Sequence, residues 1–562
     1  MSMIRRIAAL ACGVSAIGAP MSFAAAEEGE AASRHVLLVS IDGMHALDFR
    51  NCAMANTCPN LTELAETGVN YVRTSTAKPS DSFPGLMSIV TGGTPKLVGA
   101  YYDVAYDRVL APPAADTGNG VLHGDCIPGR PNGTRTEYEE GNEIDQTMLN
   151  GGGPYGPFDG GFKSIDPNKL VRDPFNGCAP VYAWNFIRAN TIYGVIHKAG
   201  GYTAWSDKHA AYAAVSGPTG TAVPSNVDDY YSPEVNSNSI PLPGVKTATG
   251  LDCSSLPNSN GGDWTTDFDN IKCYDQLKVN AVLNWIQGKT HLGGSKGRVP
   301  EIFGMNFQAV SVGQKLIASG VKGGYTDAAG TPTDSMEGEI KFVDAAIGQW
   351  VSELKRQHLL HSTTIIITAK HGQSPIDTNR FFPIPGHSGT NGTPPSALLG
   401  AAFLPDSEIN QIGATEDDIS LLWLKPGAST LAAVGVLEAN ANAAGIGQIF
   451  YGPSLEAIYG KPGLPAAGGD PRTPDIIIQP NVGVVYTGSL KKQAEHGGFA
   501  QDDTNVMLLL SNPSLKPRTV TSFVETSQIA PTVLKILGLD PNDLDAVRKE
   551  GTAVLPGLHF GE

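Results

Sequence analysis

The chain has 562 residues, of which 41% are hydrophobic, and its formal net charge is -16 at pH 7. This length accommodates one large α/β domain with insertions or roughly two to four ordinary domains, and the composition is that of a globular protein. The acidic balance argues against duplex nucleic acid as the main partner, because a phosphate backbone attracts basic surfaces. Small phosphate esters stay compatible with it, since a metal ion or a lysine can balance their charge locally.

An export signal is predicted at the N-terminus. Two arginines precede an apolar, alanine-rich run over residues 7–21, and small residues suited to cleavage follow. We therefore expect a signal peptide over residues 1–26 and a mature domain over 27–562, in the periplasm or secreted. A buried N-terminal helix is one alternative, and lipoprotein attachment at Cys12 is another. No later run is long and apolar enough to predict a membrane span.

The mature chain would keep six of the seven cysteines, an even number that fits disulfide formation in an oxidising compartment. Other connectivities are open, but proximity along the chain suggests three local pairs: Cys52 with Cys58, Cys126 with Cys178, and Cys253 with Cys273. No CxxC pair is present, which argues against a zinc ribbon.

The first predicted element is a strand over residues 35–41, whose near-continuous apolar run is typical of a parallel strand buried on both faces. Asp42 follows at its carboxyl end, where α/β proteins place their sites. Asp42 is either a turn or capping residue or a metal ligand. A helix is expected over 59–67 and a strand over 69–72.

Ser82 precedes Phe83-Pro84, a pair that indicates the start of a helix. The free N–H groups and the positive end of the helix dipole favour an anion there. A serine in this place either caps the helix or acts as a nucleophile whose developing charge the helix end stabilises. Both interpretations are open on this stretch alone.

The remaining pattern alternates strands and helices, which predicts an α/β fold with a largely parallel central sheet and helices on both faces. Two stretches rich in turn residues, about 101–180 and 217–262, are expected to be irregular cap insertions. Strands are expected at 202–206, 301–309, 363–368, 421–424, 475–479 and 506–510. Helices are expected at 189–199, 274–288, 335–359, 430–444 and 526–537.

Two further strand ends or loops resemble the Asp42-Gly43 corner. Lys370-His371-Gly372 and His496-Gly497-Gly498 each place a ligand-type side chain before glycine, where the backbone turns tightly. A lone histidine is usually structural, but two such corners beside an Asp-Gly corner and a helix-start serine predict a site. Asp207 and His209 end the strand at 202–206, and they are either substrate contacts or parts of a surface turn.

Five stretches together carry a resemblance to a known family: 35–43, 59–68, 82–92, 495–499 and 526–539. They resemble the alkaline phosphatase superfamily and, within it, the type I phosphodiesterase/nucleotide pyrophosphatase branch. The resemblance implies an alkaline-phosphatase-like fold, Ser82 as the nucleophile and a covalent phosphoryl-enzyme intermediate. It also implies two zinc-type ions, one held by residues matching Asp42, Ser82, position 370 and His371. The other would be held by an Asp-x-x-x-His pair and His496.

The chain departs from this family pattern in three places. Lys370 stands where the family has an aspartate, Val310 and Gln314 fall on the Asp-x-x-x-His pair, and Gly85 stands where an asparagine contacts the phosphate. The ligand set for two ions is therefore incomplete. We expect one divalent ion, of the zinc type, rather than two. Possible substitute ligands, each of which is otherwise a solvated side chain, are Asp81, Asp334 and Glu337.

One ion would be held by Asp42, His371 and His496 in an open site, with Lys370 adding a fixed positive charge at the nucleophile. The alternative is that Lys370 is a solvated strand-end residue and the site has decayed.

These observations predict an exported hydrolase of phosphate diesters, with a small phosphate ester as its partner and no duplex nucleic acid. The catalytic residues would be Ser82 and Lys370, and the substrate contacts Gly85, Asp207 and His209. A sulfatase-like or phosphonate-cleaving enzyme, or a phosphoester-binding protein on the same fold, is the alternative, because fold does not fix function. The sequence carries no prediction of the natural substrate or the oligomeric state.

Overall fold

The computed structural model describes residues 33–138, 161–235, 242–255, 264–385, 391–487, 489 and 491–559, so the predicted signal peptide lies outside the described residues. Within them, a nine-stranded sheet has the order β20-β2-β19-β12-β1-β9-β7-β8, with β21 paired to β2. Its strands are β1 (His35–Ile41), β2 (Val69–Ser75), β7 (Ala204–Ser206), β8 (Asp229–Tyr231), β9 (Ile302–Phe307), β12 (Thr363–Thr368), β19 (Asn505–Ser511), β20 (Arg518–Val520) and β21 (Val524–Glu525). β19 runs antiparallel to both of its neighbours, and the other pairs are parallel. The predicted α/β class with a largely parallel sheet is confirmed.

β1 lies at the centre of the sheet, with β12 on one side and β9 on the other. Successive side chains of a strand point to opposite faces. Val36 and Leu38 accordingly join the apolar core on one face, whereas Leu37, Val39 and Ile41 join the core on the other. Burial on both faces explains why this strand is apolar at nearly every position.

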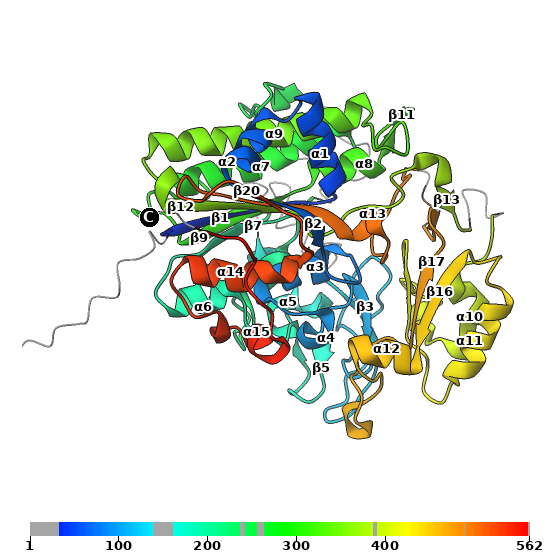
Figure 1. Cartoon of the computed structure of the whole chain (residues 1–562). Coiled ribbons are helices and arrows are strands. Elements are labelled where there is room, and N and C mark those ends of the chain that lie inside the picture. The colour runs from blue at the N-terminus through cyan, green and yellow to red at the C-terminus, as the bar shows by residue number, and fades with distance from the viewer. Residues whose placement is uncertain are drawn as a thin grey trace, which may run out of the picture.

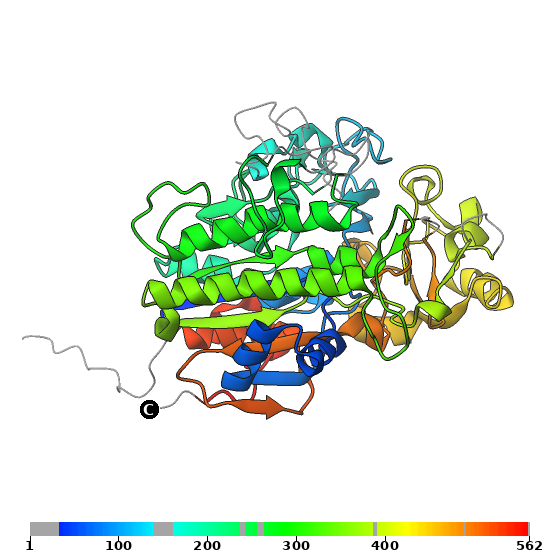
Figure 2. The ribbon, with the colours of Figure 1, turned by 90° about the horizontal axis from the view of Figure 1, so that it is seen from above.

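Helices cover both faces of the sheet (Figure 1). One face carries α1 (Ala46–Ala55), α2 (Pro59–Thr67), α7 (Phe268–Ile286), α8 (Ala309–Lys315) and α9 (Asp334–Arg356). The opposite face carries α3 (Ser82–Thr91), α4 (Pro95–Val98), α5 (Ala183–Phe186), α6 (Ile192–Lys198), α14 (Ile529–Ile536) and α15 (Asp545–Glu550). The two long helices α7 and α9 lie side by side across the sheet (Figure 2).

A second, smaller sheet lies beside the main one, at the right of Figure 1. Its order is β14-β15-β17-β16, and all its pairs are antiparallel. Its elements are β14 (Thr415–Glu416), β15 (Ser420–Leu422), β16 (Ile446–Tyr451), β17 (Ile476–Pro480), α10 (Pro395–Phe403), α11 (Thr430–Ala439) and α12 (Gly452–Tyr459). The strands expected at 421–424 and 475–479 belong here, because they pack on a separate apolar core with α10 and α11.

The two turn-rich stretches contain little regular structure in their described parts. The first holds the antiparallel pairs β3 (Val104–Asp107) with β4 (Thr134–Glu137), and β5 (Arg172–Asp173) with β6 (Ala179–Pro180). The second contains β8, which pairs in parallel with β7 and extends the main sheet. Short elements elsewhere are β10 (Ile317–Ala318), β11 (Val321–Lys322), β13 (Phe382–Pro383), β18 (Val484–Val485) and α13 (Gln501–Thr504).

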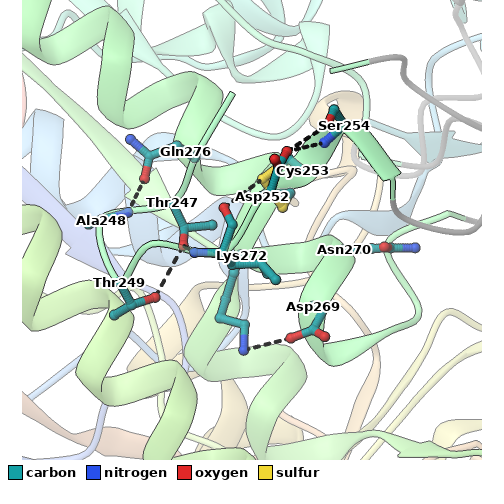
Figure 3. Close-up of a disulfide and its surroundings, with 12 residues drawn as sticks. Thr247, Ala248, Thr249, Asp252, Cys253, Ser254, Asp269, Asn270, Lys272 and Gln276 are labelled. Carbon is teal, nitrogen blue, oxygen red and sulfur yellow. Dashed lines mark hydrogen bonds and ion pairs between the residues drawn. A yellow bond between two sulfur atoms is a disulfide. The ribbon is translucent and has the colours of Figure 1, made fainter. Parts of the chain in front are cut away.

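Three disulfides join Cys52 to Cys58, Cys126 to Cys178, and Cys253 to Cys273, as proximity predicted. Figure 3 shows the third bridge, which ties the segment 242–255 to the first turns of α7. Beside it the Ala248 N–H donates to Gln276 Oε1 at 2.8 Å, so the segment is fixed to the helix twice. Among the described helices, none has the length and apolar character that a membrane crossing requires.

Candidate active site

Ser82 is the first residue of α3 and is fully buried where the carboxyl ends of β1, β12 and β7 meet. Its Oγ lies 3.0 Å from His371 Nε2 and 3.4 Å from Asp42 Oδ2. Lys208 Nζ donates to the same Oγ at 3.2 Å. The hydroxyl therefore contacts an imidazole nitrogen, a carboxylate and an ammonium group at once. The structure thus brings Ser82, Asp42 and His371 together.

The first-turn amides of α3 are already engaged. Asp81 is the N-cap, and its Oδ2 accepts a hydrogen bond from the Phe83 N–H at 3.1 Å. The Gly85 N–H donates to the Asp81 carbonyl at 2.8 Å, and Pro84 has no N–H. Gly85, the expected phosphate contact, instead allows close packing, because a Cβ there would collide with the Lys370 carbonyl. An anion at Ser82 would be stabilised by side chains more than by these amides.

Asp42 lies in a ring of donors and positive charges. Its Oδ2 accepts from Gln308 Nε2 at 2.6 Å and from Asn306 Nδ2 at 3.1 Å. Burial opposes ionisation, but Lys370 and Lys208, with the hydrogen bond from Gln308, hold the pKa of Asp42 well below its usual value. Asp42 is therefore an anion over the working range of pH.

Two lysines approach this carboxylate from different strands. Lys370 Nζ lies 3.9 Å from Asp42 Oδ2 and Lys208 Nζ lies 4.0 Å from it. Lys370 makes its closest ion pair with Asp207 Oδ1, at 3.1 Å, and stands 4.1 Å from the centre of the Tyr212 ring. Lys208 is the lysine that contacts Ser82, and burial lowers its pKa to about 7 while Asp42 opposes the shift.

At the strand end 207–209, both predicted residues are buried and have side-chain partners. Asp207 is fully buried, and its two carboxylate oxygens accept from Lys370 and from Trp205 Nε1, so it acts as an internal counter-ion. His209 Nδ1 contacts Glu234 Oε1 at 2.6 Å. Lys208, between them, belongs to the same strand end, which the sequence indicated as a substrate-side candidate, but no role of its own was predicted for it.

On the other side of Ser82 lie two neutral groups. His371 Nδ1 faces the Gly372 carbonyl at 2.8 Å, which leaves Nε2 as an acceptor, and burial lowers the pKa of His371 to about 4. The ring of His496 lies 4.0 Å from that of His371, centre to centre. His496 Nδ1 is 3.5 Å from Asp81 Oδ1. Burial lowers the pKa of His496 and raises that of Asp81, so it disfavours the charged form of each group.

The three predicted ligands of a single ion do not all converge. Asp42 Oδ2 and His371 Nε2 lie 4.0 Å apart, a spacing that two ligands of one ion can have, whereas His496 Nδ1 is directed at Asp81. Asp42 Oδ1, Asp81 Oδ1 and His496 Nδ1 have no hydrogen-bond partner among the described residues, but two ammonium groups lie within 4.0 Å of the Asp42 carboxylate. In the described ranges, no group of three or more His, Cys, Asp or Glu side chains is placed to hold a metal ion.

The ligands of the family's second ion are replaced as well. Val310 is a buried apolar residue of α8. Gln314 Nε2 donates to the Gly43 carbonyl at 2.7 Å and to Asp48 Oδ2 at 3.0 Å, so it belongs to a structural network. Asp334 is exposed at the start of α9, and Glu337 pairs with Lys341. The residues present therefore do not fit a two-ion centre.

A cavity of about 300 Å³ adjoins the site. Its lining includes Lys208, which contacts Ser82, together with His209 and His496. Asp103, Lys315 and Glu495 also line it. The cavity gives a substrate a place beside the nucleophile, and its wall carries both signs of charge.

The central sheet with helices on both faces, and a buried serine at a helix N-terminus beside two lysines, is the arrangement of an alkaline-phosphatase-like fold. The family model described as type I phosphodiesterase / nucleotide pyrophosphatase matches residues 36–121 and 185–503. The chain belongs to this family, and it is a phosphoric ester hydrolase.

The solved structures agree on the fold. The chain is similar to murine ectonucleotide pyrophosphatase / phosphodiesterase 5 at 14% identity, with a TM-score of 0.50, 90% of this chain covered and 96% of that one. An inactive variant of the murine protein in complex with AMP matches at 13% identity, a TM-score of 0.50 and the same coverage. No curated protein matches the sequence significantly.

Proposed function

We propose that this chain hydrolyses nucleotide-type phosphate diesters, with Ser82 as the nucleophile and a covalent phosphoryl-enzyme intermediate. The observation that carries the proposal is the Ser82 hydroxyl, which lies 3.0 Å from an acceptor nitrogen of His371 and 3.2 Å from the Lys208 ammonium. The murine relative whose inactive variant binds AMP supports a nucleotide as substrate or product.

In the first step the Ser82 oxygen forms a bond to phosphorus while the bond from phosphorus to the leaving oxygen breaks. The hydroxyl proton passes to His371 Nε2, which is positioned to accept it, and from there to the leaving oxygen. In the second step water attacks phosphorus and the Ser82–phosphorus bond breaks. The proton lost by water is returned to the Ser82 oxygen through the same nitrogen, so the free hydroxyl is restored.

The family is metal-dependent. The finer expectation from the sequence, one zinc ion on Asp42, His371 and His496, is not part of this mechanism, because those side chains do not all converge. No step above depends on a metal ion.

The disulfides support a proposal about the compartment in which the protein acts. Three bridges are typical of a protein that matures in an oxidising compartment. We therefore propose that the protein acts after export, in the periplasm or outside the cell.

The test is turnover of an aryl phosphodiester by the purified chain and by Ser82→Ala. Loss of the nucleophile should lower turnover by ~10³-fold or more. Ser80→Ala is the matched control, because the Ser80 hydroxyl donates to the Asp503 carbonyl at 2.6 Å and does not contact Ser82 in the described structure. Near-normal activity of Ser82→Ala would overturn the assignment. Aryl sulfate and phosphonate esters, tested in parallel, separate this activity from its two alternatives.

A further inference from the structure

The buried charges next to Ser82 balance without a metal ion. In the part of the chain that the structure describes, Asp42 and Asp207 bring two carboxylates and Lys208 and Lys370 bring two ammonium groups. Asp42, Asp207 and Lys370 are fully buried, and Lys208 is 7% exposed. Burying a charge is costly unless an opposite charge and hydrogen bonds compensate it. Lys370 has that compensation from Asp207 at 3.1 Å, and Asp42 opposes the effect of burial on Lys208.

A dication between Asp42 and Ser82 would disturb this balance. It would add two positive charges within a few ångströms of two ammonium groups, and the family's additional aspartate is replaced by Lys370 itself. A protonated lysine has no lone pair and cannot be a ligand. The two ammonium groups and the replacement of a ligand by Lys370 therefore both oppose an ion at this place.

The anion must nevertheless be stabilised at Ser82. The Phe83 and Gly85 amides of α3 are engaged with Asp81, as described above. The neutral ring of His371 accepts the Ser82 proton at Nε2 and brings no positive charge before that transfer. Lys208 Nζ, at 3.2 Å from Ser82 Oγ, is the cation that touches the reacting atom. It also lines the cavity where a substrate phosphate would lie.

We infer that Lys208 is a catalytic residue that takes the place of the divalent ion at Ser82, so that this chain transfers the phosphoryl group without a metal ion there. Its ammonium group stabilises the Ser82 oxygen during attack and the negative phosphate oxygens in the transition state. Lys370 positions the site by neutralising Asp42 and Asp207. This inference rests on the proposed phosphodiesterase function and assigns the source of its electrostatic stabilisation.

The first experiment measures metal content and turnover on the same full-length preparation. We expect zinc and other divalent metals well below one equivalent per chain, and unchanged aryl phosphodiester turnover after treatment with a chelator. One or more equivalents that leave with the chelator together with the activity, and restore it when zinc is added back, would overturn the inference. Because Ser82→Ala would still be inactive in that case, the proposed function would survive.

The second experiment changes Lys208 alone. Lys208→Met keeps the length of the side chain but removes its charge, and should lower turnover by about 10²–10³-fold. It should also weaken binding of orthovanadate, a phosphate analogue, to the chelator-treated protein, as measured by calorimetry. Lys208→Arg should recover part of the turnover and part of the vanadate affinity. Lys535→Ala, on an exposed position of α14, should change neither the turnover nor the vanadate affinity.

A Lys208→Met protein with normal turnover and normal vanadate affinity would contradict the inference. Thermal unfolding of each variant shows whether the fold is retained. If Lys208→Met does not fold, the turnover and vanadate affinity of Lys208→Gln replace those of Lys208→Met. The metal content of the unmodified chain tests the inference independently of any variant.

Discussion

The buried polar and charged side chains on the two sides of Ser82 are compensated in different ways. On the Asp42 side, two carboxylates and two lysines form ion pairs of 3.1–4.0 Å, and neutral amides complete the hydrogen bonds. On the His496 side, Asp81 and His496 lie 3.5 Å apart, and burial disfavours the charged form of each. The first side is held by charge pairs, although Asp42 Oδ1 has no hydrogen-bond partner among the described residues. The second side has no ion pair between charged groups of this kind, its Asp81 Oδ1 and His496 Nδ1 are unpartnered within the described residues, and its histidine lines the cavity.

This contrast assigns different tasks to the two sides. Fixed opposite charges resist reorganisation, which suits a group that stabilises developing charge at a defined oxygen. Neutral groups with free hydrogen-bonding capacity are suited to a variable substrate. Changes on the Asp42 side should therefore affect folding and chemistry together, whereas changes on the His496 side should affect substrate use with little effect on folding.

The largest effect on stability is expected for Asp207→Asn. It removes the closest counter-ion of the buried Lys370 while keeping the shape of the side chain. Breaking a buried pair in this way costs about 3–5 kcal/mol in the free energy of unfolding. Urea unfolding of the variant measures this, and the double variant Asp207→Asn/Lys370→Met should recover a substantial part. A double variant as unstable as the single one would contradict the ion-pair account.

A smaller loss is expected for Gln308→Met. Its Nε2 donates to the charged Asp42 at 2.6 Å, and a hydrogen bond to a charged group contributes about 1.5–3 kcal/mol. Urea unfolding again gives the change. The adjacent substitution Phe307→Leu, in the apolar core of β9, serves as a control for packing without loss of that hydrogen bond. An unchanged stability of Gln308→Met would show that the lysines alone hold Asp42.

The smallest effect is expected for His496→Phe. The ring remains to pack on His371, and the lost Nδ1 has no hydrogen-bond partner among the described residues. The free energy of unfolding should change by less than about 1 kcal/mol, because replacing an unpaired polar group by an apolar one is nearly neutral. The KM for the aryl phosphodiester should nevertheless rise, since His496 lines the cavity. A loss of stability as large as that of Asp207→Asn would erase the contrast between the two sides.

Local sequence patterns predicted the elements around Ser82 closely. The apolar runs gave the bounds of β1 and β12, and Pro59 with Gly68 gave those of α2. In each case the signal lies within the element: continuous burial for the strands, and a proline start with a glycine stop for the helix. The second sheet was missed because short apolar strands look alike whether they join the main sheet or a separate one.

The candidate site was only partly predictable for a related reason. Ser82, Asp42 and His371 follow from corners at strand and helix ends, and the structure brings them together. Which of the residues 207–209 faces Ser82 depends on β7 pairing beside β9, and on Lys370 taking Asp207 as its partner. Both are long-range contacts that no local pattern contains. Lys208 therefore emerged only from the three-dimensional arrangement.

The most direct test of the account is to trap the intermediate on metal-free protein. The chelator-treated chain is mixed with an aryl phosphodiester and quenched in acid during turnover, and its peptides are analysed by mass spectrometry. The account predicts that Ser82 carries the phosphorus together with the ester group that the diester retains, although the chelator is present. The same adduct found on another residue, or found on Ser82 only after zinc is restored, would contradict it.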